Sequence, residues 1–152
     1  MMLKLKVPPP IYMLLMAVLM WGLDKYFPIH DLESSLGVKL GVLLIITALI
    51  VDLKSLLQFF RGHTTINPIH PEKSRTLITT GMYQYSRNPM YLGLLFLLTG
   101  WGFILASASP LIMLPVFVVI ITRQQILPEE QVLEQKFGQQ YRDYKKSVKR
   151  WL

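Results

Sequence analysis

The sequence predicts an all-α integral membrane protein with about four transmembrane helices. Hydrophobic residues make up 52% of the 152 residues and the mean hydropathy is +0.39, which is too apolar for an ordinary soluble domain. Several apolar runs are long enough to cross a bilayer. The formal net charge of +7 is concentrated in the segments between these runs, and basic segments of a membrane protein mark cytoplasmic loops.

The same charges predict the orientation. Four spans place the N-terminal lysines, the loop of residues 61–87 and the C-terminal tail on one side of the membrane, which the positive-inside rule makes the cytoplasm. We expect a single membrane domain over residues 1–152 with both termini cytoplasmic. Its two N-terminal spans occupy residues 1–61. A basic excess of this kind binds membrane lipids, so we expect no nucleic-acid partner. The sequence carries no signal for an oligomeric state.

The first two expected spans are residues 11–26 and 36–51. The first follows three prolines, which cannot continue a helix. The second is followed by Asp52 and Lys54, which point to different helix faces and are expected to meet water or lipid headgroups. The apolar pattern beyond them lets this helix continue along the membrane interface to Arg61.

A polar and basic segment, residues 62–88, follows the second span. Pro68 and Pro71 exclude a regular helix in its middle, and a connection of this length is uncommon unless it has a function. His63 and His70 are too few for a metal site in a chain without cysteine. We interpret these histidines as hydrogen-bonding loop residues and expect no metal.

Two further spans, residues 89–106 and 111–127, form an antiparallel hairpin because the turn between them is short. Pro89 suits the first position of a helix, and Asn88 before it suits the N-cap. An arginine at such a helix mouth suits snorkelling to lipid phosphates as well as ligand binding. The residue types alone leave both interpretations open.

The hairpin brings two polar clusters to one surface. We expect it to place Arg123 and the Glu129-Glu130 pair, which follows a helix stop at Pro128, beside Arg87. These side chains come from distant parts of the sequence. Their predicted proximity is the basis of the expected site.

After Glu130 the pattern changes to an amphipathic helix. Its apolar residues recur at spacings of three and four. They are Leu133, Phe137, Tyr141, Tyr144, Val148 and Trp151. We expect a cytoplasmic helix that lies in the membrane surface or closes over the polar mouth of the hairpin, with a bend at Gly138.

Five motifs occur in order along the C-terminal two-thirds of the chain. They are Thr64-Thr65-Ile66-Asn67-Pro68, Thr80-Gly81-Met82-Tyr83, Ser86-Arg87-Asn88-Pro89-Met90-Tyr91-Leu92-Gly93, Pro128-Glu129-Glu130 and Phe137-Gly138-Gln139-Gln140-Tyr141-Arg142-Asp143-Tyr144. In this combination the chain resembles the isoprenylcysteine carboxyl methyltransferases and their relatives, the phospholipid N-methyltransferases. Two positions depart from the family pattern, since Asn88 stands where many members have histidine and Met82 where proline often follows the glycine.

The resemblance implies an integral membrane enzyme that binds S-adenosylmethionine in a cytoplasm-facing pocket within residues 62–152. It implies methyl transfer to a lipophilic acceptor, either a small molecule or a lipid-modified one. The resemblance is to the bacterial type of these enzymes and implies a location in the bacterial cytoplasmic membrane. The positions that match the family's cofactor-binding block are Arg87, Asn88, Pro89, Tyr91, Glu129 and Glu130. Asparagine does not titrate near neutrality, so an acid–base role does not carry over to Asn88.

The charged parts of that cofactor match charged side chains of this sequence. The cofactor's ammonium group suits Glu129 or Glu130, and its carboxylate suits the planar fork of Arg87 or Arg123. Arg123 and Glu130 are the candidate catalytic residues.

The rest of the cofactor matches the segment before the third span. Tyr83 and Tyr91 offer aromatic faces to the sulfonium. Backbone groups between Leu77 and Gly81 suit the adenine edge, because a glycine permits close approach. We expect these residues to complete the binding site.

Other functions stay open at this level. A non-enzymatic four-span scaffold would use the basic tail to bind anionic lipid. A reductase-like relative would bind a nicotinamide cofactor, although a phosphate-rich ligand favours more basic residues and no paired carboxylates. Among methyltransferases, a carboxylate acceptor needs no general base, whereas the amine of a phospholipid needs one. No residue stands out as a base, which favours a carboxylate or a thiolate acceptor.

Overall fold

The computed structural model describes residues 7–29, 35–61 and 76–152, and every regular element in these ranges is helical, as predicted. The α-helices are α1 (Pro9–Tyr26), α2 (Ser35–Arg61), α3 (Pro89–Leu105), α4 (Met113–Ile121), α5 (Leu127–Phe137) and α6 (Gln139–Ser147). Short 3₁₀ turns, η2 (Gly81–Gln84) and η3 (Ser109–Ile112), precede α3 and α4. The π-helical turn η4 (Thr122–Ile126) joins α4 to α5.

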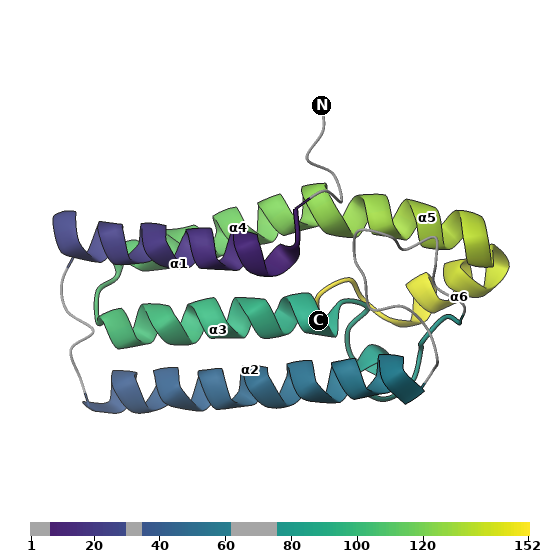
Figure 1. The fold of residues 1–152 in the computed structure, drawn as a ribbon, viewed down its shortest axis with the longest axis horizontal. Helices are drawn as coiled ribbons and strands as arrows, with labels where there is room; N and C mark the ends of the chain where they lie inside the picture. The colour runs from purple at the N-terminus through teal and green to yellow at the C-terminus, as the bar shows by residue number, and fades with distance from the viewer. Residues whose placement is uncertain (1–6, 30–34, 62–75) are drawn as a thin grey trace.

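The long helical segments lie side by side and alternate in direction (Figure 1). Helix α3 packs against α2 on one side and against α1 and α4 on the other. The end of α2, the start of α3, and α5 with α6 lie toward the same end of the bundle (Figure 1). The antiparallel hairpin predicted from the short turn is therefore present, and it carries the polar segments to one end.

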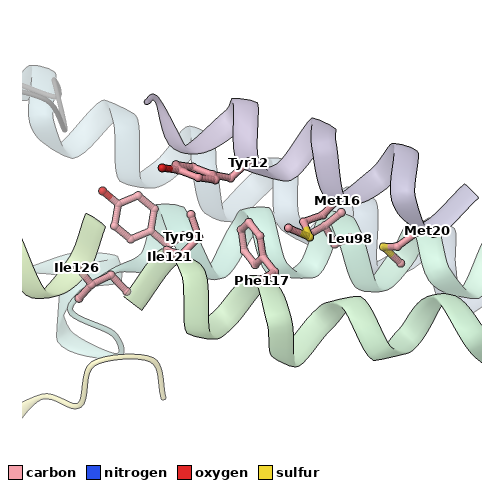
Figure 2. Close-up of a cluster of buried hydrophobic side chains, with 8 residues drawn as sticks. All are labelled: Tyr12, Met16, Met20, Tyr91, Leu98, Phe117, Ile121 and Ile126. Carbon is pink, nitrogen blue, oxygen red and sulfur yellow. The ribbon is translucent and has the colours of Figure 1, made fainter. Parts of the chain in front are cut away.

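The core of the bundle lies between α1, α3 and α4 (Figure 2). Met20, Leu98 and Phe117 are fully buried there, one from each of these helices. Tyr12 and Tyr91 continue the cluster toward the polar end. Burial of large side chains at each level stabilises the mutual positions of the helices that carry the site.

Two glycines bring α2 and α3 into close contact. A Cβ atom on Gly100 would lie 2.6 Å from the carbonyl oxygen of Gly41, and a Cβ on Gly41 would lie 2.7 Å from that of Gly100. Only residues without a side chain allow backbones to approach this closely, which is the packing that apolar helices use in membranes. The α2–α3 pair is thus a tightly packed unit.

The outward surfaces of the bundle are apolar. Large side chains such as Leu14, Val18, Leu43 and Leu53 are more than half exposed. Among the described residues, Ser35–Gln58 and Ser109–Phe137 are long and apolar enough to cross a membrane, and α3 is a shorter apolar helix. These features support membrane association; of the four predicted spans, two meet the requirements of length and composition.

Two predicted helix boundaries are wrong, both at proline. Helix α1 begins at Pro9, because a proline in the first turn lacks only an N–H that would have no partner. The fourth helical segment does not stop at Pro128 but continues to Phe137. The π-helical turn immediately before Pro128 widens the helix, and such turns accommodate interruptions of the regular hydrogen-bond ladder.

The C-terminal segment forms α5 and α6 rather than one amphipathic helix, with the break at the glycine expected to bend it. Gly138 has φ 53° and ψ −121°, which a residue with a side chain rarely adopts. Helix α6 folds back under α5 at this point (Figure 1). Its Tyr141 and Tyr144 pack with Tyr83, so this face covers the polar end of the bundle.

Candidate active site

The candidate site lies where the start of α3 meets the start of α5. Pro89 occupies the first turn of α3, and Asn88 is the N-cap residue. The Asn88 side chain does not cap the helix, contrary to the prediction. Its Nδ2 atom instead donates a 2.9 Å hydrogen bond to the carbonyl oxygen of Arg150. Arg87 is therefore held at the helix mouth by contacts with the end of the chain.

Glu130 is the centre of the charged cluster. Its Oε1 lies 3.1 Å from Nη2 of Arg87, and both side chains are less than one-tenth exposed. Arg150 binds the same carboxylate through a fork, with Nε donating to Oε1 and Nη2 to Oε2, both at 2.9 Å. The predicted proximity of Arg87 and Glu130 is thus present, but the two groups touch rather than face each other across a gap.

Glu129 has a different partner. The hydroxyl group of Tyr91 donates a 3.0 Å hydrogen bond to its Oε2. This bond ties the first turn of α5 to the first turn of α3. Consecutive residues on a helix point in different directions, so the acidic pair divides into Glu130 in the arginine cluster and Glu129 beside the tyrosine.

The last residues of the chain, which we call the C-terminal strap (residues 148–152), cross this site. The backbone N–H of Arg87 donates to the carbonyl oxygen of Lys149 at 3.0 Å. The indole Nε1 of Trp151 donates to Oγ1 of Thr122 in the π-helical turn at 3.2 Å. The strap therefore connects the loop before α3 with the segment that carries the acidic pair.

Two tyrosines close the side of the site toward α6. The hydroxyl of Tyr144 donates a 2.6 Å hydrogen bond to the carbonyl oxygen of Tyr83. Burial, followed by the charge of Glu129, raises the pKa of Tyr83 well above its ordinary value. Burial likewise raises the pKa of Tyr141, the charge of Glu130 adds to this effect, and the charge of Arg87 opposes it. These phenols therefore stay protonated.

Leu77 and Gly81 belong to the wall next to Tyr83. Leu77 packs against the cluster of Tyr83 and Tyr141. Gly81 has φ 60°, and a Cβ there would overlap the side chain of Gln58. Gln58 holds this turn by donating to the carbonyl oxygen of Thr80 at 2.8 Å and accepting from the N–H of Met82 at 3.1 Å.

Asp52 corrects another expectation. Rather than meeting water or headgroups, its carboxylate lies across Gly93 of α3, where any Cβ would overlap it. Its Oδ1 atom is buried and has no hydrogen-bond partner among the described residues. The charge of Asp52 also raises the pKa of Tyr83, after the larger effects of burial and of the charge of Glu129. Asp52 therefore lies close to the site, from the α2 side.

Some predicted residues do not join the cluster. The side chain of Arg123 is exposed on η4, and in the described part of the chain no ion pair or hydrogen bond involves it. His63, His70 and the motif of residues 64–68 lie outside the described residues. Among the described residues, no group of three or more acidic, histidine or cysteine side chains is placed to hold a metal ion.

The sequence reasoning missed Arg150, Gln58 and Asp52 as members of this region. Neither Gln58 nor Arg150 belongs to a recognisable sequence pattern, because the role of each depends on contacts between distant segments. For Asp52 there was a signal, since an acidic residue next to a membrane run is costly unless it has a partner or a function.

Arg87 has unused hydrogen-bonding capacity. Its Nε and Nη1 atoms are buried and have no hydrogen-bond partner among the described residues. Together, Arg87, Arg150 and Glu130 carry one net positive charge, and the carboxyl group of Glu129 follows Glu130 directly in the chain. An anion beside Arg87 and a cation beside Glu129 would both be stabilised. The N–H groups of Arg87 and the carboxyl group of Glu129 therefore fit the amino-acid part of a zwitterionic ligand, including that of S-adenosylmethionine.

The fold and site define a helical, membrane-associated protein with a buried charged site at one end of its bundle. Residues 36–140 match the model of the phospholipid methyltransferase family, so the chain belongs to that family. This confirms the predicted family and class of enzyme, a methyltransferase.

Individual relatives agree with this assignment. Protein-S-isoprenylcysteine O-methyltransferase A of Arabidopsis thaliana is 32% identical over 108 residues, which cover 71% of this chain and 55% of that protein. The Dictyostelium discoideum protein-S-isoprenylcysteine O-methyltransferase is 37% identical over 79 residues, 47% of this chain and 30% of that protein. An uncharacterized Haemophilus influenzae protein is 43% identical over 63 residues, 41% of this chain and 100% of its own length.

The matched stretch thus spans about half, or less, of the named methyltransferases. No solved structure matches this chain.

Proposed function

We propose that this protein transfers a methyl group from S-adenosylmethionine to a lipophilic acceptor at the cytoplasmic face of the membrane. The observation that carries the proposal is the buried guanidinium of Arg87 beside an acidic pair, because its Nε and Nη1 atoms have no hydrogen-bond partner in the part of the chain that the structure describes. A buried donor without a partner costs free energy unless a ligand satisfies it. Membership of a methyltransferase family supports this ligand being the methyl donor.

Different residues bind different parts of S-adenosylmethionine. Arg87 binds the carboxylate through Nε and Nη1, and Glu129 binds the ammonium group, since Tyr91 occupies only its Oε2 atom. The backbone of residues 77–81 meets the adenine, held in place by Gln58. Glu130 acts through Arg87 as a positioning residue rather than touching the ligand.

The bound donor supplies an electrophilic methyl group on a sulfonium. The protein's part is alignment and exclusion of water, because methyl transfer is an in-line displacement. The aromatic rings of Tyr83 and Tyr91 are both buried; Tyr91 bonds to Glu129, and Tyr83 packs with Tyr141 and Tyr144. They provide a dry wall with an electron-rich face for the sulfonium.

Calorimetry of the purified protein with S-adenosylhomocysteine tests donor binding. Arg87→Ala and Glu129→Gln each remove one charged hydrogen-bond partner, and we expect about 10- to 100-fold weaker binding from each. Arg142→Ala is the matched control, because Arg142 is half exposed and lies 4.0 Å from Glu134. Absence of binding to the wild type, or unchanged binding by both site variants, contradicts the proposal.

For the acceptor we propose a carboxylate on a lipid-modified molecule. The named relatives are O-methyltransferases, and a carboxylate acceptor needs no general base. Asn88, which bonds to the carbonyl oxygen of Arg150, agrees with this chemistry because its amide does not titrate and so offers no base.

One observation favours a second candidate, methylation of an amine such as a phospholipid headgroup. Asp52 places a carboxylate near Tyr83 from α2, and its Oδ1 atom has no hydrogen-bond partner among the described residues. In amine methylation the nitrogen forms the new bond to carbon as the carbon–sulfur bond breaks, and its proton passes to a base. Asp52 is the residue placed to accept it.

Membranes incubated with donor labelled in its methyl group separate the two candidates. A methyl ester releases its label as methanol in alkali, whereas an N-methyl group is stable. We expect alkali-labile label in the lipid and protein fractions. Alkali-stable label that Asp52→Asn abolishes, while S-adenosylhomocysteine still binds, would instead establish the amine reaction.

A further inference from the structure

The C-terminal strap carries a second arginine into the site, and its geometry is more specific than a chain end requires. The Arg150 fork is bidentate, with both bonds at 2.9 Å, to a carboxylate whose side chain is 7% exposed. Bidentate pairs of this kind are directional as well as strong. The hydrogen bond to Glu130 also raises the pKa of Arg150, with burial opposing it.

The neighbours of Arg150 in the strap are anchored independently. Lys149 accepts a hydrogen bond from the N–H of Arg87 through its carbonyl oxygen. The carbonyl of Arg150 accepts from Asn88 at 2.9 Å, and Trp151 donates to Thr122. These bonds fix the backbone on both sides of Arg150, so its guanidinium reaches Glu130 from a set direction.

The arrangement decides how Arg87 can use its donors. With a carboxylate to itself, an arginine favours a bidentate pair that occupies both oxygens. Here Arg150 occupies Oε2 and shares Oε1, so Arg87 reaches Glu130 through Nη2 alone. Its Nε and Nη1 atoms find no hydrogen-bond partner within residues 7–29, 35–61 and 76–152. The presence of Arg150 therefore leaves Arg87 both a surplus positive charge and free donors.

We propose that Arg150 is a positioning residue that prevents Arg87 from forming a bidentate pair with Glu130. The Nε and Nη1 atoms of Arg87 then remain available to bind the carboxylate of S-adenosylmethionine. The inference rests on the proposed function. It makes the seated strap part of the binding-competent site. It also predicts that Arg150 acts on one chemical group of the ligand, its carboxylate, and not on the ligand as a whole.

Two ligands that differ only in that group test the inference by calorimetry. They are S-adenosylhomocysteine and its decarboxylated form, which keeps the ammonium and the nucleoside. The wild type is expected to favour S-adenosylhomocysteine by about tenfold or more, in line with one lost charged hydrogen-bond partner. Arg150→Ala is expected to remove most of that preference while leaving the affinity for the decarboxylated ligand within about twofold.

Variants on the same strap sharpen the result. Lys149→Ala is the control, because the Lys149 side chain is exposed and its strap contact is made by the backbone; it should keep the wild-type preference. Arg150→Lys keeps the charge but not the fork, and is expected to lose part of the preference. If Arg150→Ala fails to fold, Arg150→Lys replaces it as the test variant.

Each other outcome is decisive. If the wild type binds neither ligand, the proposed function fails. If it binds S-adenosylhomocysteine but the Arg150 variants keep the full preference, lose affinity for both ligands equally, or bind more tightly, this inference fails alone. Equal loss would indicate a purely structural strap, and tighter binding would indicate a strap that competes with the ligand.

Discussion

The guanidinium of Arg87 lies 3.1 Å from the carboxylate of Glu130, and the two side chains are only 8% and 7% exposed. Because Arg150 binds the same carboxylate, three charges share a largely buried space. Such a cluster is stabilising only while all of its members are present, since each charge lost leaves the others without compensation. The fold and the candidate site therefore depend on the same contacts.

Neutralising Glu130 should destabilise the protein markedly. Glu130→Gln removes the carboxylate that both arginines bind, and we expect a cost of about 3 kcal/mol, at the lower end for buried pairs because Arg150 is 35% exposed. Thermal unfolding in detergent measures this change. Glu134→Gln is the control, since Glu134 is 35% exposed and its partner Lys145 is 34% exposed; a similar loss in both variants would count against a special role for Glu130.

Helix packing makes opposite predictions for two glycine-to-alanine changes. In Gly100→Ala the new methyl group would lie 2.6 Å from a backbone oxygen of α2, so we expect the α2–α3 pair to separate and stability to fall by about 1–3 kcal/mol. Gly22→Ala meets nothing within 4 Å and should stabilise α1 by up to about 1 kcal/mol. Unfolding temperatures of the two variants should move in opposite directions; a fall in both would contradict the packing argument.

The bond between α6 and the loop before α3 predicts a difference between two tyrosines. Tyr144→Phe removes the donor to the Tyr83 carbonyl, a buried bond of 2.6 Å, and should cost about 1–2 kcal/mol. Tyr85→Phe is the matched change at a side chain that is 69% exposed and should have little effect. Hydrogen exchange should also rise across α6 in the first variant alone, and equal exchange in both would show that α6 is held by its apolar face only.

Gln58 is predicted to order the turn that contains Gly81. Gln58→Ala removes a donor to Thr80 and an acceptor for Met82, so we expect a loss of about 1–2 kcal/mol in local stability. Faster hydrogen exchange at the Met82 amide is the measurement. Gln135→Ala, at an exposed position of α5, is the control. Unchanged exchange at Met82 would mean that the turn is held by packing around Tyr83 instead.

Much of the architecture follows from local patterns. The apolar runs and the short turn at residues 107–110 determine the helices and the antiparallel hairpin, because an apolar helix in a membrane must satisfy its own backbone. The turn at residues 107–110 also places the start of α3, with Arg87, beside the start of α5, with Glu130. The proline at residue 89 determines where α3 begins. These features depend on neighbours in sequence, so the sequence alone determined them.

The partners within the site were decided by tertiary structure. Which glutamate meets an arginine and which meets Tyr91 depends on the rotation of α5, and this is set by the π-helical turn before Pro128, for which the sequence has no reliable sign. The place of Arg150 depends on the break at Gly138 and on how α6 packs beneath α5. The sequence determines the charge of each side chain. The partner of that side chain depends on its direction, which is determined by how the helices pack.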